Sequence, residues 1–220
     1  MVLDGARIRQ WGRAQRSGVV ASPLSLDQFH VVWSASLRRQ FDRYLAGELS
    51  YDEQRLTRVR EVIDPTLSDE AADRVFSIYL DKYEAGWSLF PDVESALEKL
   101  SHHRMGIVTN GQVLQQRAKL ERTGLLDRFD CVVISEDYGT AKPDPAIFLR
   151  ACSLLGEAPS SCVHVGDHYD LDVMGARRAG LGSILLDRAG NATAEHEPPI
   201  IRSLDAVADP VRAQSRHDPG

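Results

Sequence analysis

Three carboxylates lie close together in the segment HVGDHYDLD, residues 164–172. Asp167, Asp170 and Asp172 directly follow an apolar segment, and like charges at this spacing repel one another unless a cation or a hydrogen-bond donor compensates. Carboxylate oxygens are the ligands that Mg²⁺ prefers, and this ion usually keeps several waters besides one or two carboxylates. The segment therefore indicates either a metal site or a solvated turn whose aspartates begin a helix.

Two other apolar segments are also followed by residues suited to binding an anion. Thr109-Asn110-Gly111 follows one, and a threonine hydroxyl with backbone N–H groups beside a glycine can hold phosphate oxygens. Lys142 follows another, and its ammonium can neutralise a phosphoryl group or shield carboxylates. Taken together, these residues predict a phosphate and magnesium site made of Thr109, Asn110, Gly111, Lys142, Asp167 and Asp172.

The elements that must position these groups are predicted by alternating patterns from residue 91 onward. Short, nearly continuous apolar runs predict strands, and amphipathic patterns predict helices between them. The expected strands are 105–109, 131–135, 161–167 and 182–187, and the expected helices are 91–100, 112–124, 145–156 and 172–180. This order predicts an α/β fold with a doubly wound parallel sheet of the Rossmann type. The carboxyl ends of parallel strands share one edge, so the polar groups should meet there.

In residues 6–86 the apolar residues recur at helical spacing, and no segment has a convincing strand pattern. Ser25-Leu26-Asp27-Gln28 and Ser50-Tyr51-Asp52-Glu53 both fit the capping box that begins a helix. Trp11, Trp33 and His30 are interpreted as packing residues on these helices. The predicted organisation is a helical cap over 6–86, an α/β core over 87–206 and a flexible tail over 207–220.

Composition limits the possible classes of protein. A chain of 220 residues with 43% hydrophobic and 26% charged residues is long enough for a globular domain with a sizeable core. The net charge of −6 argues against a broad basic surface for nucleic acid, and no apolar run approaches a membrane span. The three cysteines have no paired spacing and are interpreted as reduced thiols in a cytoplasmic protein.

Three segments, IVTNGQ (107–112), YGTAKPDPAIF (138–148) and HVGDHYDLDVMGARRAG (164–180), resemble motifs II, III and IV of the haloacid dehalogenase superfamily of hydrolases. The resemblance implies a helical cap inserted into a Rossmann-type core and a role for Thr109 in phosphate binding. It also implies that Lys142 steadies the nucleophile and that Asp167 and Asp172 hold Mg²⁺. Asp170 has no such role in the motif.

Motif I of this superfamily, D-x-D-x-T-L-x-D, has no complete counterpart in the sequence. If Asp4 is its second aspartate, Val2 occupies the position of the nucleophile. If Met1-Val2-Leu3-Asp4 instead matches the closing T-L-x-D, both aspartates lie upstream of the recorded start. We favour the second alignment, which leaves more room before the first cap helix.

The function implied by the resemblance is Mg²⁺-dependent hydrolysis of a small phosphomonoester, such as a nucleotide or sugar phosphate, through an aspartyl phosphate. The nucleophile is then missing from this chain, whose own activity is expected to be negligible. The alternatives are a non-catalytic relative that binds phosphate or metal, and a haloacid dehalogenase-type hydrolase. A small phosphorylated metabolite is the expected partner, and neither nucleic acid nor a membrane is expected.

Overall fold

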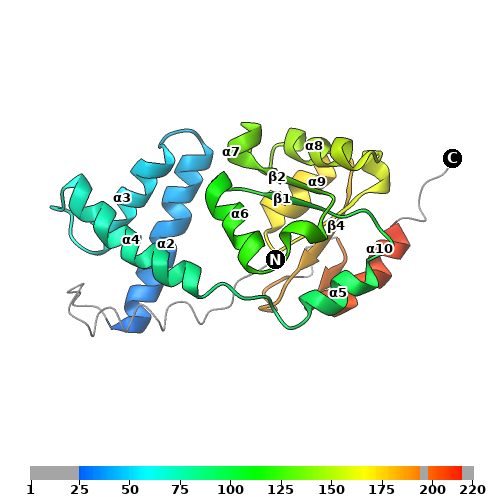
Figure 1. Ribbon diagram of the computed structural model, residues 1–220, viewed down its shortest axis with the longest axis horizontal. Helices are drawn as coiled ribbons and strands as arrows, with labels where there is room; N and C mark the ends of the chain where they lie inside the picture. The colour runs from blue at the N-terminus through cyan, green and yellow to red at the C-terminus, as the bar shows by residue number, and fades with distance from the viewer. Residues whose placement is uncertain (1–24, 194–197, 215–220) are drawn as a thin grey trace. The chain divides into compact units, whose positions relative to one another are not determined.

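The computed structural model describes residues 25–193 and 198–214. These residues form two compact units that divide between Ser88 and Leu89, here called the cap unit and the core unit (Figure 1). The predicted motif I alignments at Asp4 and the residue Trp11 lie outside the described residues. Each unit has its own hydrophobic core and is considered separately below.

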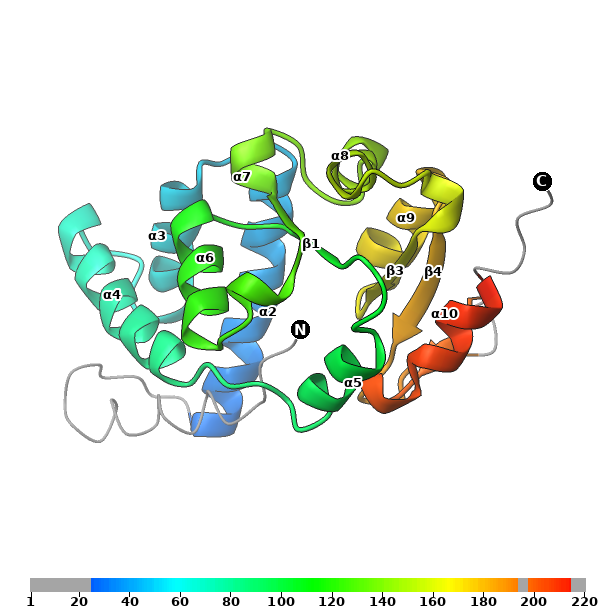
Figure 2. The same ribbon diagram turned by 45° about the vertical axis from the view of Figure 1, so that its right-hand side comes forward.

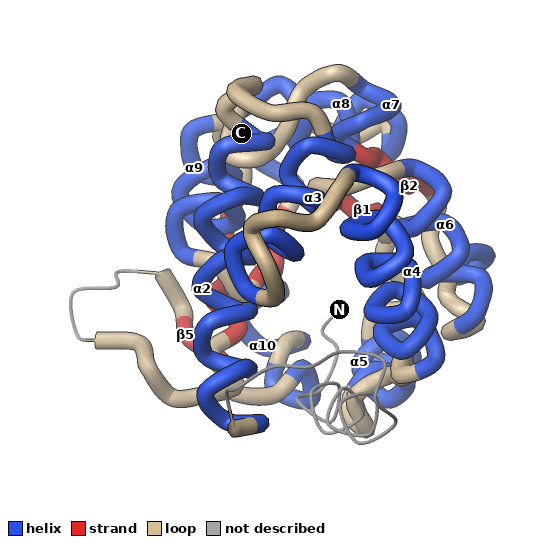
Figure 3. Tube along the Cα trace, turned by 90° about the vertical axis from the view of Figure 1, so that its left-hand side faces the viewer, coloured by secondary structure: helices blue, strands red, loops and turns tan. Residues whose placement is uncertain are grey.

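The described residues of the cap unit form three helices and no strand (Figure 3). They are α2 (Leu26–Leu45), α3 (Tyr51–Val62) and α4 (Asp69–Ala85). The two predicted capping boxes are confirmed: Gln28 N donates to Ser25 Oγ over 3.3 Å and Glu53 N donates to Ser50 Oγ over 3.1 Å. Each box satisfies two backbone donors that a helix start would otherwise leave without a partner.

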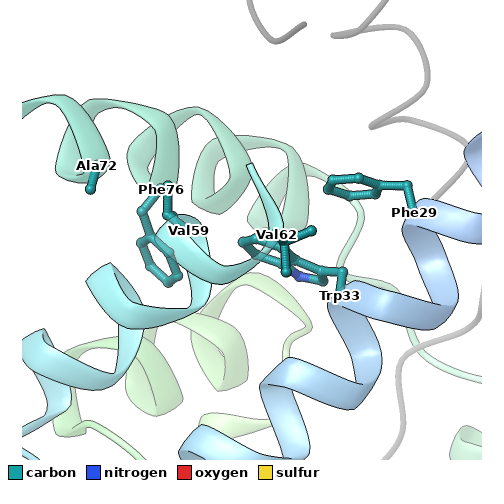
Figure 4. Close-up of a cluster of buried hydrophobic side chains, with 6 residues drawn as sticks. All are labelled: Phe29, Trp33, Val59, Val62, Ala72 and Phe76. Atoms are coloured by element: carbon teal, nitrogen blue, oxygen red, sulfur yellow. The ribbon is translucent and has the colours of Figure 1, made fainter. Parts of the chain in front are cut away.

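The helices of the cap unit enclose an apolar cluster of Phe29, Trp33, Val59, Val62, Ala72 and Phe76 (Figure 4). The indole of Trp33 is 3% exposed and lies between the rings of Phe29 and Tyr79 at centroid distances of 5.8 and 4.8 Å. The interpretation of Trp33 as a packing residue is therefore confirmed. The side chain of His30 lies outside the described part of the chain.

The strands of the core unit are all parallel. They are β1 (Gly106–Thr109), β2 (Cys131–Ile134), β3 (Val163–Gly166), β4 (Gly182–Leu186) and β5 (Ile200–Ile201). The first four match the predicted strands, whereas β5 is too short to carry a detectable pattern. Within the described residues the strands form two sheets, β1-β2 and β3-β4-β5 (Figure 2). The α/β fold is confirmed, with its sheet in two parts.

Helices connect and cover these strands. The α-helices are α5 (Val93–Lys99), α6 (Val113–Arg122), α7 (Ser135–Tyr138), α8 (Pro145–Leu155), α9 (Gly175–Arg178) and α10 (Ala208–Gln214). Short 3₁₀ turns are η1 (Leu126–Arg128), η2 (Pro159–Ser161) and η4 (Leu204–Ala206). The helix expected over 172–180 begins earlier, as a π-helical segment η3 (Tyr169–Met174).

A flexible tail is predicted over residues 207–220, but residues 208–214 of this range form helix α10. Val207 is 1% exposed, and both it and Val211 pack against a cluster that contains Ile184 and Leu186. Residues 208–214 are therefore held as a helix by apolar contacts with β4, which the local sequence does not reveal. Among the described residues, no helix is long and apolar enough to cross a membrane.

Candidate phosphate-binding site

The polar groups predicted to meet at one sheet edge line a common cavity. Thr109 ends β1, Asp167 follows β3, and Lys142 lies in the loop between α7 and α8. These three side chains and Asp172 all line a cavity of about 580 Å³ within the core unit. The topology thus brings a hydroxyl, an ammonium and carboxylates together at the carboxyl ends of parallel strands, where open α/β sheets bind ligands.

A buried ion pair lies at the centre of this group. Lys142 Nζ is 2.5 Å from Asp172 Oδ1, and the two side chains are 14% and 5% exposed. His164 Nε2 lies 3.3 Å from the same oxygen, and the backbone N–H of His168 donates to Asp172 Oδ2 over 3.0 Å. Both oxygens of Asp172 are therefore engaged, and the carboxylate is fixed in one orientation.

The environment of Asp172 favours its charged form. Burial acts to raise the pKa of this carboxyl, but the hydrogen bond from His164 and the charge of Lys142 outweigh burial and hold the pKa below its usual range. Burial lowers the pKa of His164, and the hydrogen bond to Asp172 opposes that shift only in part. Because Asp172 Oδ1 is an acceptor, the contact with His164 Nε2 requires that this nitrogen carry the proton and donate it to the carboxylate.

The close approach of Asp172 to the end of β3 depends on Gly166. A Cβ atom added at this position would lie 2.3 Å from both Cβ and Cγ of Asp172, far inside van der Waals contact. The π-helical segment η3 then returns the chain so that Asp172 faces back toward the strand end. The glycine of the HVGD segment is therefore required by packing against the carboxylate that follows it.

Asn110 positions the loop that carries Lys142. Its Nδ2 donates to the carbonyl oxygen of Lys142 over 3.0 Å, and the N–H of Lys142 donates back to Asn110 Oδ1 over 2.8 Å. This reciprocal pair joins the end of β1 to residue 142, 32 residues later in the chain. Since the oxygen and the nitrogen of the Asn110 amide each make one of these bonds, the observed role of Asn110 is to place Lys142.

Thr109 and Gly111 are held by two residues that the sequence analysis did not single out. Thr109 Oγ1 donates to Gln116 Oε1 over 3.3 Å, and Gln116 is 7% exposed on α6. The N–H of Gly111 donates to Ser135 Oγ over 3.0 Å, so this N–H is already engaged. Gly111 has a φ of +135°, a region that favours glycine. Neither Gln116 nor Ser135 lies in a recognisable local pattern, because each acts across elements.

The carboxylate oxygens of Asp167 and Asp172 are chemically suitable ligands for Mg²⁺. Asp167 is exposed and Asp172 is 3% exposed, so one carboxylate is open to solvent and one is fixed. Among the described residues, no group of three or more histidine, cysteine or acidic side chains is arranged to hold a metal. Two carboxylates nevertheless fit an ion that takes most of its ligands from water and substrate phosphate. Asp170 is exposed within η3 and is not part of the donor set.

Comparison with protein families agrees with the arrangement of the core unit. The family model described as haloacid dehalogenase-like hydrolase matches residues 7–180. The chain belongs to the haloacid dehalogenase-like hydrolases. The match includes Thr109, Lys142, Asp167 and Asp172, so the resemblance inferred from the three sequence motifs is confirmed at the level of the family.

Curated relatives within this hydrolase family include phosphatases. Haloacid dehalogenase-like hydrolase domain-containing protein 3 from Danio rerio is 37% identical over 164 residues, which cover 71% of this chain and 65% of the relative. Glyceraldehyde 3-phosphate phosphatase from Methanopyrus kandleri is 42% identical over 101 residues, or 45% of this chain and 43% of that enzyme. The chain thus spans between 43% and 65% of the length of these two relatives.

Solved structures of haloacid dehalogenase-like hydrolases share the fold. The crystal structure of YfnB from Bacillus subtilis, bound to magnesium, superposes with a TM-score of 0.75 at 22% sequence identity. The superposition covers 93% of this chain and 91% of the YfnB chain. At this level of identity the similarity establishes the fold, namely an α/β core accompanied by a helical cap.

Proposed function

We propose that this hydrolase acts on a small phosphomonoester, a nucleotide or sugar phosphate, with Mg²⁺ and through an aspartyl phosphate. The observation that carries the proposal is the position of Lys142. Its ammonium lies against Asp172 at the carboxyl ends of two parallel strands, is largely buried and lines the same cavity as Thr109. A buried ammonium beside a hydroxyl is suited to an anionic group of the size of phosphate.

Lys142 retains hydrogen-bonding capacity for a ligand. An ammonium has three N–H donors, and the contact with Asp172 uses one of them. The remaining donors would bind phosphoryl oxygens, and the Thr109 hydroxyl would do so by turning its single proton from Gln116 Oε1 toward the ligand. Asn110 and Gln116 would keep these two groups in place, since they contact Lys142 and Thr109 directly.

The attacking carboxylate comes from outside the described residues in this proposal. Asp172 already accepts hydrogen bonds from Lys142, His164 and the His168 N–H, so its lone pairs are poorly available for attack. In the proposed reaction, a carboxylate oxygen forms a bond to phosphorus while the bond to the ester oxygen breaks. The second aspartate of motif I, also outside the described residues, would give its proton to the leaving alkoxide. Water then cleaves the aspartyl phosphate and releases phosphate.

Asp167 and Asp172 would hold Mg²⁺ directly or through water, and water is the better route for Asp172 because its oxygens already accept three hydrogen bonds. When bound, the ion offsets the negative charge of the phosphoryl group. Lys142 would remain beside Asp172 and share the task of charge compensation. The magnesium-bound form of YfnB supports this assignment through the shared fold alone.

Small phosphorylated metabolites are supported as substrates by the names of the relatives. The matched phosphatase from Methanopyrus kandleri acts, by its name, on glyceraldehyde 3-phosphate. Cys131, Cys152 and Cys162 are free thiols, which supports a cytoplasmic location. A non-catalytic relative would share the phosphate site but show no turnover under any condition, and a dehalogenase would release halide from 2-haloacids.

The phosphate site is tested by the melting temperature in phosphate or vanadate. At about ten times Kd, mass action should stabilise the chain by about 1.4 kcal/mol, or about 3–6 °C. Lys142→Ala should lose most of this shift. Lys99→Ala, a control on α5 whose side chain is 45% exposed and pairs with Asp205, should retain it. Retention of the full shift by Lys142→Ala would place the anion elsewhere.

The metal assignment is tested separately by calorimetric titration with Mg²⁺. We expect weak binding by the chain and weaker binding by Asp167→Asn, because one of two carboxylate ligands is then neutral. Equal heats from both proteins would contradict the assignment of Asp167. The measurement does not depend on turnover and is therefore informative even without an attacking carboxylate.

A further inference from the structure

His164 is a polar residue at a strand position whose neighbours are apolar. It is the second residue of β3, between Val163 and Val165, and its side chain is 14% exposed. The rings of His164 and Phe148, a residue of α8, meet edge to face with their centroids 5.0 Å apart. The imidazole is therefore held between a strand and a helix, where a polar ring needs a hydrogen-bond partner.

That partner is Asp172, and the hydrogen bond occupies one particular oxygen of the carboxylate. His164 Nε2 lies 3.3 Å from Asp172 Oδ1, which also accepts a hydrogen bond from Lys142 Nζ over 2.5 Å. Asp172 Oδ2 accepts a hydrogen bond from the His168 N–H over 3.0 Å. A carboxylate has about four acceptor sites, two on each oxygen. Among the described residues, the acceptor site of Asp172 that is left without a donor therefore lies on Oδ2.

The two side chains that donate to Oδ1 differ in their freedom to move. Lys142 reaches Asp172 through a flexible four-carbon stem, and in the proposed function its ammonium also binds the phosphoryl group. His164 has a rigid ring that packs against Phe148, and its side chain makes no other hydrogen bond among the described residues. The imidazole is therefore the donor that stays in place while Lys142 also contacts a ligand.

Asp172 Oδ2 lies close to the segment that carries the second carboxylate of the site. A Cβ atom added at Gly166 would be 2.5 Å from Asp172 Oδ2. Gly166 directly precedes Asp167, so this oxygen is next to the part of the chain that leads to the other proposed ligand of Mg²⁺. An ion held by both carboxylates, directly or through water, would therefore use Oδ2 of Asp172.

We infer that His164 is a positioning residue: by holding Asp172 Oδ1, it leaves Oδ2 for a water of the bound Mg²⁺. Hydrogen-bond partners of this kind orient a metal-binding carboxylate from outside the set of ligands, and their loss typically weakens metal binding by about 10–100-fold. The orientation of Asp172 follows from the hydrogen bonds alone, whereas the role toward Mg²⁺ rests on the proposed function.

Hydrogen exchange at the His168 amide tests the orientation without any metal. His164→Leu suits the apolar surroundings but has no donor, so the Asp172 carboxylate should rotate and the His168 amide should exchange about tenfold faster. His164→Gln keeps an N–H donor and should restore the parent rate. His102→Leu removes an exposed imidazole and should leave the rate unchanged. Equal rates in the parent and His164→Leu, no rescue by glutamine, or equal acceleration at Ile184 in β4 would overturn the inference.

Calorimetric titration with Mg²⁺ tests the role toward the metal. His164→Leu should bind Mg²⁺ at least about tenfold more weakly than the parent, and His164→Gln should recover most of the affinity. Parent affinity in His164→Leu, or equally weak binding by His164→Gln, would overturn this role. If the parent itself binds no Mg²⁺ while the His168 exchange rates respond as expected, the proposed metal site fails and the orientation of Asp172 by His164 stands.

Discussion

Lys142 and Asp172 are 30 residues apart in the sequence, and their side chains form a buried ion pair with a separation of 2.5 Å. The pair joins the loop before α8 to the π-helical segment after β3. It therefore connects the two parts of the core unit that carry the separate sheets.

A double-mutant cycle measures this connection. Lys142→Met leaves a buried carboxylate without its ammonium, and Asp172→Asn leaves the ammonium without its carboxylate, so each variant should be destabilised. Urea unfolding should show that the double variant is more stable than the sum of the two single effects predicts. We expect a coupling free energy of about 2 kcal/mol between the two side chains. Additivity within about 0.5 kcal/mol would show that the pair contributes no specific stability.

Gly166→Ala should displace Asp172. The added methyl group would lie 2.3 Å from the Asp172 side chain, and overpacking of this kind costs about 1–3 kcal/mol. The matched control is Gly166→Ala combined with Asp172→Gly, which removes the atoms that clash. Chemical denaturation should show a smaller effect of Gly166→Ala in that background. An equal effect in both backgrounds would indicate that the glycine serves backbone flexibility instead.

Asp92 gives the core unit a pH-dependent contribution to stability. Asp92 is 8% exposed, and its carboxylate accepts two hydrogen bonds from Arg188, from Nη1 over 2.7 Å and from Nη2 over 3.0 Å. It also accepts hydrogen bonds from Ser203 Oγ over 2.9 Å and from the Leu204 N–H over 2.7 Å. Burial acts to raise the pKa of Asp92, but these hydrogen bonds and the charge of Arg188 hold the pKa below its usual range. The carboxylate thus stabilises the folded state above about pH 3.9, and this stabilisation is lost as pH falls below that value.

Asp92→Asn should accordingly destabilise the chain by about 3 kcal/mol at pH 7 and by less at pH 3.5. Urea unfolding of the parent and the variant at both pH values checks the prediction. In an Arg188→Met background the substitution should cost much less at pH 7, because its principal partner is already gone. A difference that grows as pH falls would contradict the sign of the pKa shift.

Arg58 in the cap unit is a buried cation with incomplete hydrogen bonding. It is 3% exposed, and its Nε and Nη2 have no hydrogen-bond partner. Its guanidinium carbon lies 4.7 Å from the ring centroid of Trp33 and 5.4 Å from that of Phe76, and burial lowers the pKa of Arg58. The cation is thus held by aromatic faces while part of its desolvation is not compensated.

Arg58→Met should therefore raise the free energy of unfolding by about 1 kcal/mol, since an apolar side chain of similar length removes the uncompensated charge. Arg55→Met is the matched control on the same helix. Arg55 forms ion pairs with Asp52 over 3.2 Å and with Asp73 over 2.7 Å, so its loss should lower stability. Loss of several kcal/mol in Arg58→Met would show that the cation–aromatic contacts dominate.

The parts of the fold that local sequence determines could be predicted. The capping boxes at Ser25 and Ser50 depend on side chains three residues away, and the strands 106–109 and 163–166 are continuous apolar runs. In contrast, β5 has only two residues and α10 is held by Val207 and Val211 against β4, so both depend on tertiary contacts.

The same distinction applies to the site. The positions of Thr109, Lys142 and Asp172 after apolar strands indicated that they would meet, and all three line one cavity. Gln116 and Ser135 could not be foreseen, because a glutamine within a helix and a serine at a strand end are ordinary in sequence. His164 occupies a strand position where an apolar residue is usual, and that exception was the available signal for its contact with Asp172.

The division of the core sheet into two parts also bears on the behaviour of the purified chain at high concentration. Among the described residues, β1 pairs with β2 alone and β3 with β4 alone, and a strand edge without a partner can pair with the same edge of another copy. Pairing of this kind favours aggregation, whereas the net charge of −6 opposes self-association. Self-association of the chain would then depend on the four residues of β1 and the four residues of β3 as well as on its net charge.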